Sequence, residues 1–214
     1  MAQRSVHVQR SLWTCAGRTL RVDPSMNAAA LANTRLGQAV LRLLAAIMES
    51  RLRYRFFGPE KALEGAGIRP GQTVLEVGCG TGFFTIPAAR LLGDQGRLVA
   101  MDRLPVSTEA VAAKVRTAGL TNVLVVVGNA LDTRLEAESM DVVLIFGVIP
   151  APMLPMDTLL AEMHRILKPG GTMAVWPPSW IHRTIRRSGF FAYSGRRHGV
   201  VTYRSAGEGR GSTL

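Results

Sequence analysis

The stretch Val74-Leu75-Glu76-Val77-Gly78-Cys79-Gly80-Thr81-Gly82 decides the fold, because an apolar run ends there in a glycine-rich turn. The run has the aliphatic residues of a buried strand, and a helical pattern follows it at residues 83–92. Glycines let the backbone adopt positive φ and approach a ligand closely, and the helix presents free N–H groups. The stretch therefore predicts a strand, a turn and a helix that hold a nucleotide-like ligand.

Short β-rich runs alternate with helical patterns from residue 71 onward. The predicted strands are residues 73–77, 97–102, 123–128, 140–147 and 172–176, and the predicted helices are residues 83–92, 105–118 and 155–167. This alternation is typical of βαβ units with a parallel sheet. A short helix after residue 179 and a hairpin of residues 190–194 and 199–203 complete the pattern. We expect an α/β fold, a Rossmann-like three-layer sandwich.

The chain has 214 residues, which suits one main domain. We expect that domain over residues 58–204, with a flexible tail at residues 205–214. Residues 1–22 lack sustained periodicity and predict a disordered tail, although their arginines and serines also fit an organelle transit peptide. Residues 23–57 contain an amphipathic helical pattern and are interpreted as an N-terminal helical lid.

The net charge of +11 lies in the two flanks of the chain. Residues 1–58 carry +7, residues 59–176 carry −2 and residues 177–214 carry +6. Basic flanks attract nucleic acid or anionic lipid, and the alternative is simply an arginine-rich composition. Because the middle of the chain is slightly acidic, we expect nucleic acid to bind weakly and non-specifically.

Cysteine content and hydropathy argue against a disulfide framework, a metal site and a membrane-spanning helix. Cys15 and Cys79 are too few for a disulfide framework, and no Cys/His cluster has the spacing of a metal site. The apolar residues 142–156 are too few to cross a membrane and contain prolines. We expect a cytoplasmic protein without a transmembrane helix, and peripheral membrane contact through the N-terminal helix stays open.

Asp102 indicates which class of ligand the glycine-rich turn binds. It ends the second predicted strand, 20 residues after Gly82, where an acid can accept hydrogen bonds from both hydroxyls of a ribose. The alternative is that Asp102 caps the next helix. Dinucleotide sites favour the spacing G-x-G-x-x-G, which this turn does not have. The glycine-rich turn and Asp102 together indicate an adenosine-containing cofactor.

The whole pattern Glu76-x-Gly78-x-Gly80-x-Gly82 resembles the first motif of the class I S-adenosylmethionine-dependent methyltransferases. A second segment, LAEMHRILKPGG at residues 160–171, resembles small-molecule members related to quinone-biosynthesis C-methyltransferases. The resemblance covers about residues 58–204. It implies a methyltransferase domain with S-adenosyl-L-methionine as cofactor, and a seven-stranded, mostly parallel sheet whose last strand is antiparallel.

The resemblance also implies which residues contact the cofactor. They are Glu76, Gly78, Cys79, Gly80, Gly82, Asp102, Arg103, Asn129, Ala130 and Phe146. Glu76 would organise the turn, and Asp102 would bind the ribose. Asn129 departs from the acid that the family has there, but its carbonyl can still accept a hydrogen bond from the adenine amino group. Phe146 is as compatible with a plain core position as with the face where methyl donor and acceptor meet.

Methyl transfer depends mainly on alignment of donor and acceptor, and the chain offers no convincing general base. We expect His164 to be solvated, and His182 and His198 have no evident partner in the sequence. Cys79 is interpreted as a small space-filling residue. The catalytic residues are therefore left unassigned.

The segment at residues 147–152 lacks the Asn/Asp-Pro-Pro-aromatic motif with which nucleic-acid amino-methyltransferases hold a planar nitrogen. This favours a small, apolar methyl acceptor. Aromatic residues that could line its pocket are Tyr54, Phe56, Phe57, Trp176 and Trp180. The alternatives are an RNA methyltransferase, and a non-catalytic or dinucleotide-binding protein with a Rossmann-like core. The oligomeric state does not follow from the sequence.

Overall fold

The computed structural model describes residues 58–148, 154–176 and 181–206. The strands are β1 (Thr73–Val77), β2 (Arg97–Asp102), β3 (Val123–Val127), β4 (Met140–Phe146), β5 (Leu167–Trp176), β6 (Phe191–Arg197) and β7 (Val200–Ser205). The helices are α4 (Pro59–Gly65), α5 (Thr85–Leu92), α6 (Pro105–Thr117), α7 (Met156–Ile166) and α8 (His182–Arg187). The predicted tail and helical lid of residues 1–57, and the tail beyond residue 206, lie outside the described residues.

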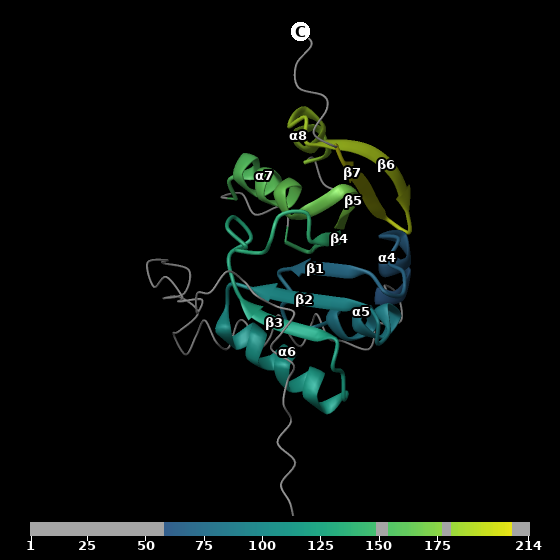
Figure 1. Ribbon diagram of the computed structural model, residues 1–214, viewed down its shortest axis with the longest axis vertical. Helices are drawn as coiled ribbons and strands as arrows, with labels where there is room; N and C mark the ends of the chain where they lie inside the picture. The colour runs from purple at the N-terminus through teal and green to yellow at the C-terminus, as the bar shows by residue number, and fades with distance from the viewer. Residues whose placement is uncertain (1–57, 149–153, 177–180, 207–214) are drawn as a thin grey trace, which may run out of the picture.

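All seven strands form one sheet in the order β3-β2-β1-β4-β5-β7-β6 (Figure 1). Strands β1 to β5 pair in parallel, whereas β7 pairs antiparallel with both β5 and β6. The predicted seven-stranded sheet with an antiparallel last strand is therefore confirmed. The strand order reverses between β1 and β4, and ligands of such open sheets bind beyond the carboxyl ends of the strands at this point.

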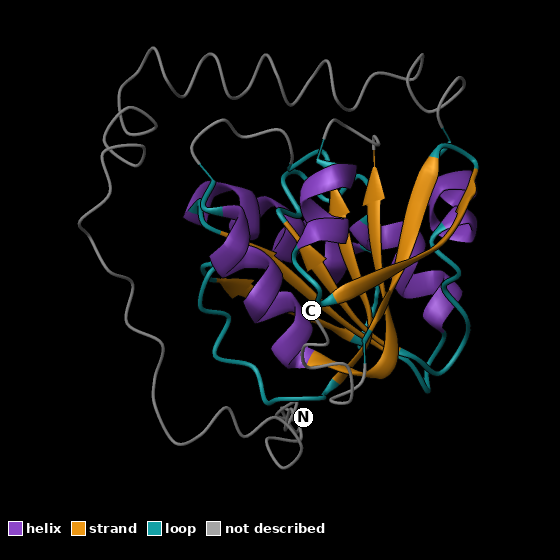
Figure 2. Ribbon diagram, turned by 90° about the horizontal axis from the view of Figure 1, so that it is seen from above, coloured by secondary structure: helices purple, strands orange, loops and turns teal. Residues whose placement is uncertain are grey.

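Helices cover both faces of the sheet and make three layers (Figure 2). One core joins α7 and α8 to alternate strand residues such as Val77, Met101 and Ile145. The opposite core joins α4 and α5 to the intervening residues, such as Leu144 and Phe146, and α6 packs on that same face. This alternation is what a sheet buried on both sides requires.

Most bounds agree with the prediction to within two residues, β6 continues three residues further, to Arg197, and two larger differences concern β5 and α4. Strand β5 begins at Leu167 and not at residue 172, because Leu167 pairs with Met140 before the register shifts. Helix α4 was not predicted, and it buries Ala62 and Leu63 against the sheet. Pro87 lies in the first turn of α5, where a helix tolerates proline.

Candidate cofactor site

The turn between β1 and α5 is built on three glycines in the left-handed region. Gly78 has a φ of 70°, Gly80 of 52° and Gly82 of 86°. The backbone N–H groups of Gly78 and Cys79 both donate to the carbonyl oxygen of Met101, at 2.8 and 3.0 Å. Two backbone hydrogen bonds therefore hold the turn against β2.

Each glycine meets different surroundings. A Cβ on Gly78 would lie 2.5 Å from Cγ2 of Val148, and one on Gly82 would lie 3.2 Å from Cγ2 of Val111. A Cβ on Gly80 would have no atom within 4 Å. Gly78 and Gly82 thus allow close packing on both sides of the turn, whereas Gly80 exposes its backbone to open space that a ligand can enter.

Asp102, at the carboxyl end of β2, is joined to this turn. Its Oδ2 accepts a hydrogen bond from the backbone N–H of Gly80 at 2.9 Å, and its Oδ1 accepts one from Leu104 at 2.9 Å. Leu104 precedes the first residue of α6, so Asp102 does not cap an N–H inside the helix. A carboxylate offers about four acceptor positions, so these two hydrogen bonds leave capacity for ribose hydroxyls.

Glu76 lies behind the turn and is buried. Its Oε2 accepts a hydrogen bond of 2.6 Å from the hydroxyl of Thr85, the first residue of α5. Burial raises the pKa of Glu76 to about 8, the Thr85 hydrogen bond opposes the rise, and the charge of Asp102 adds to it. Glu76 therefore connects the strand before the turn to the helix after it. Thr85 was not predicted, because nothing in the spacing distinguishes it from other threonines.

Cys79 and Thr81 complete the turn. The Cys79 side chain is buried, and burial, followed by the negative charges of Glu76 and Asp102, raises the pKa of its thiol. A neutral, buried thiol is a space-filling group and a poor nucleophile, in agreement with the interpretation from sequence. The carbonyl oxygen of Thr81 accepts a hydrogen bond of 2.8 Å from Nζ of Lys114 in α6. Lys114 is a further residue of this region that the sequence did not identify.

The remaining predicted cofactor contacts lie after β2, β3 and β4. Arg103 is exposed in the connection between β2 and α6. Asn129 is half-buried, and its Oδ1 accepts a hydrogen bond of 3.1 Å from the N–H of Leu131, which uses one of its two acceptor positions. Ala130 packs against the core beneath α7. No observation assigns these three residues to a ligand.

Phe146 ends β4 inside a group of aromatic side chains. It is 4% exposed, and its ring centroid lies 4.9 Å from that of Phe84 and 6.3 Å from that of Trp176, both in edge-on arrangements. Trp176 is half-buried at the end of β5. Tyr54, Phe56, Phe57 and Trp180 lie outside the described residues. The end of β4 is therefore apolar, with Trp176 as its partly exposed member.

The prediction that His164 is solvated is wrong. His164 is half-buried, its Nε2 lies 2.8 Å from the carbonyl oxygen of Ala206, and its ring packs against Phe190 and Phe191. His182 has a partner, since its Nδ1 lies 2.5 Å from the hydroxyl of Tyr203.

His198 has a partner as well, which the sequence did not reveal. Its Nε2 lies 3.5 Å from a carboxylate oxygen of Glu64. These contacts join residues far apart in sequence, which spacing alone does not reveal. Within residues 58–148, 154–176 and 181–206, no three His, Cys, Asp or Glu side chains are arranged to hold a metal ion. Over the same residues, no helix is long and apolar enough to cross a membrane.

Comparison with known proteins agrees with this geometry. Residues 74–171 match the family model described as a methyltransferase domain. The demethylmenaquinone methyltransferase of Staphylococcus aureus (strain MRSA252) is 36% identical over 115 residues, which are 52% of this chain and 45% of that protein. The chain thus spans about half the length of the curated relatives that it matches.

Solved structures show the same fold. A SAM-dependent methyltransferase from Aquifex aeolicus superposes with a TM-score of 0.65 at 22% identity, covering 78% of this chain and 96% of that chain. Geranyl diphosphate C-methyltransferase from Streptomyces coelicolor A3(2), solved with S-adenosyl-L-homocysteine, has a TM-score of 0.58 at 14% identity and covers 69% of this chain and 75% of that chain.

Residues 74–171 are similar to a methyltransferase domain, and the strand order and the glycine-rich turn agree with that similarity. Among curated proteins, this part of the chain is similar to demethylmenaquinone methyltransferases. The resemblance stated from sequence and the expected fold are both confirmed.

Proposed function

We propose that this protein transfers a methyl group from S-adenosylmethionine to a small, apolar acceptor. The observation that carries the proposal is the pairing of Asp102 with Gly80, which places an acidic acceptor beside the open space at the glycine-rich turn, at the carboxyl end of the sheet. An acidic side chain at this place can accept hydrogen bonds from the hydroxyls of a ribose.

The residues present fit this cofactor. Asp102 has acceptor positions left for the ribose hydroxyls, Gly80 leaves space at the turn, and Asn129 retains one acceptor position for an amino group. When bound, S-adenosylmethionine supplies a methyl group that its sulfonium makes electrophilic. The acceptor's nucleophilic atom forms the new bond to that methyl group, and the carbon–sulfur bond breaks.

The protein's contribution to this reaction is orientation. Asp102 and the glycine-rich turn would hold the methyl donor. The hydrogen bond between Glu76 and Thr85 behind the turn makes the turn rigid. Neither Cys79 nor Glu76 is suited to remove a proton from the acceptor. The thiol is buried and its pKa is raised, and the carboxyl group is buried and bonded to Thr85. We therefore propose alignment without a general base among the residues of the turn.

An apolar acceptor is supported by the carboxyl ends of β4 and β5. Phe146 and the partly exposed Trp176 lie there, and Val148 follows β4 against the glycine turn. The curated relatives are named for demethylmenaquinone, an apolar quinone. We propose an acceptor of that chemical class, in the cytoplasm, with nucleic acid binding only weakly and without sequence preference.

The test is a methyl-transfer assay with S-adenosylmethionine labelled in its methyl group. The purified full chain would be incubated with apolar acceptors, including reduced demethylmenaquinone, and separately with RNA. Label in an organic-phase product supports the proposal. Label in RNA and in none of the apolar acceptors would replace it by the RNA-methyltransferase alternative.

A further inference from the structure

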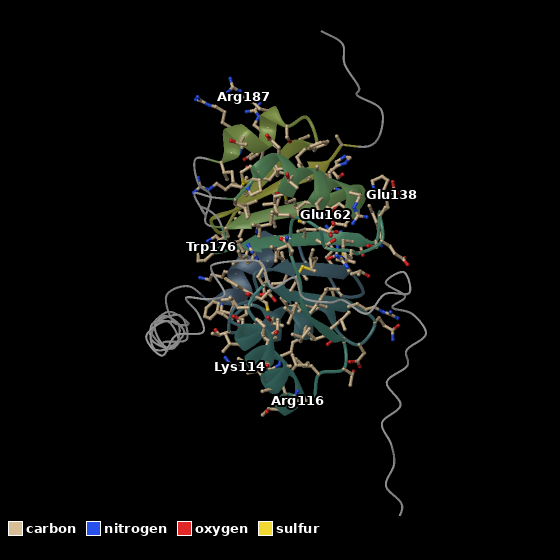
Figure 3. All side chains as sticks on the ribbon, turned by 90° about the vertical axis from the view of Figure 1, so that its left-hand side faces the viewer. Lys114, Arg116, Glu138, Glu162, Trp176 and Arg187 are labelled. Carbon is tan, nitrogen blue, oxygen red and sulfur yellow. The ribbon has the colours of Figure 1, made fainter. Side chains whose placement is uncertain are left out.

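Helix α8 carries a group of cationic side chains that the proposed reaction does not use. Arg183, Arg186 and Arg187 line a hollow of about 360 Å³ together with His182. All three arginines are exposed and form no ion pair with any residue that the structure describes. Figure 3 shows Arg187 at the opposite end of the molecule from Lys114 and Arg116.

The spacing of the arginines places them on one side of the helix. Residues three and four apart are neighbours on a helix surface, so Arg183 lies next to both Arg186 and Arg187. Like charges at this spacing destabilise a helix. Arg186 and Arg187 lie in the last turn, where cations are favourable, but Arg183 lies in the first turn, where they are not. The helix dipole therefore explains Arg186 and Arg187 but does not explain Arg183.

His182 gives the hollow a fixed wall. Its Nδ1 lies 2.5 Å from the hydroxyl of the buried Tyr203, and its ring packs edge-on to Tyr193 at a centroid distance of 5.5 Å. These contacts hold the ring in place. Its Nε2 has no hydrogen-bond partner within the described residues and is available to a ligand. Tyr193 is 51% exposed at the same place.

We propose that this hollow on α8 binds a phosphate-type anion through Arg183, Arg186, Arg187 and His182. A guanidinium group can donate two parallel hydrogen bonds to the oxygens of one phosphate. The negative charge of the phosphate also relieves the repulsion between neighbouring arginines. The anion belongs either to a small phosphorylated molecule or to the headgroup of an anionic lipid. The proposal does not depend on methyl transfer.

The test compares the full chain with two triple variants of equal charge. One is Arg183→Gln/Arg186→Gln/Arg187→Gln. The control is Arg69→Gln/Arg90→Gln/Arg116→Gln, whose three exposed arginines are dispersed over the molecule. Binding of inorganic pyrophosphate is measured by calorimetry. Binding of vesicles of phosphatidylcholine, with and without phosphatidylglycerol, is measured by sedimentation.

We expect the natural chain to bind at least one probe, and the α8 variant to bind it at least about tenfold more weakly while the control is unchanged. Pyrophosphate binding that depends on α8 identifies a small phosphorylated ligand. Dependence on α8 for phosphatidylglycerol vesicles alone identifies a lipid headgroup. Equal losses in both variants would show diffuse attraction by net charge and would overturn the proposal, as would the absence of binding to either probe.

Discussion

Oδ2 of Asp102 accepts a hydrogen bond of 2.9 Å from the backbone N–H of Gly80, so the last residue of β2 is bonded to the centre of the glycine-rich turn. The bond joins two segments that are 22 residues apart. One carboxylate thus shapes the turn and, in the proposed cofactor site, also accepts hydrogen bonds from the ribose. Loss of Asp102 should therefore affect the position of the turn as well as a ligand contact.

Asp102→Ala should weaken binding of S-adenosylmethionine by on the order of 2 to 4 kcal/mol, because charge-assisted hydrogen bonds contribute about 1.5 to 3 kcal/mol each and their losses are not additive. Titration calorimetry measures the effect. Asp132→Ala is the control, since its carboxylate is exposed and pairs with Arg134 at the surface. Equal affinity in the Asp102 variant and the natural chain would remove Asp102 from the cofactor site.

Gly80→Val should abolish cofactor binding while the domain stays folded. A side chain there fills the open space beside the turn and is strained at a φ of 52°. Gly119→Val is the matched control, because Gly119 has a φ of 65°, open space around it and a place after α6, away from the turn. Both variants should lose similar stability in thermal unfolding, but Gly119→Val should keep its affinity. Natural affinity in Gly80→Val would contradict the assignment.

Glu76→Gln should change how stability depends on pH. Burial raises the pKa of Glu76 to about 8 from an ordinary value of 4.5. Its contribution is fully present below pH 4.5 and is lost as pH rises through 8, because the unfolded chain releases a proton that the folded chain retains. The natural chain should lose on the order of 3 to 5 kcal/mol relative to the variant over this interval. Denaturant unfolding across pH measures it, and Glu109→Gln in α6, an exposed position, should show no such trend.

Glu162→Gln should show the opposite pH dependence. Burial alone would raise the pKa of Glu162, but hydrogen bonds from Arg165 and Thr133 outweigh it and lower the pKa below 4.5. The stabilising contribution is present above pH 4.5 and is lost as pH falls through the lowered value. At neutral pH the variant should be less stable by about 1 to 3 kcal/mol, and the two proteins should converge in acid. A constant difference across this range would show that ionisation of Glu162 is not involved.

The strands of this domain were predictable from sequence because parallel strands buried on both faces are continuous apolar runs. Strands β1 and β2 have the bounds that the sequence predicts, and β3 and β4 each end one residue earlier. Strand β5 is longer because its first pair, Leu167 with Met140, depends on a register shift that local composition does not encode.

The site was predictable only where a motif fixes the backbone. Gly78, Gly80 and Gly82 have the positive φ that the motif requires, and Asp102 lies beside them. The partners Thr85 and Lys114 depend on how helices dock on the sheet, which single-residue patterns do not show. The surroundings of His164 were mispredicted for the same reason, because they come from a segment 42 residues away.

Titration calorimetry of the full chain with S-adenosylmethionine, S-adenosylhomocysteine and NAD tests the central claim most directly. The three ligands share adenosine, so the comparison separates the class of cofactor from general affinity for a nucleoside. We predict saturable binding of S-adenosylmethionine and S-adenosylhomocysteine at one site, with NAD at least about a hundredfold weaker. Binding of NAD with equal or higher affinity, or no binding of S-adenosylmethionine, would contradict the account.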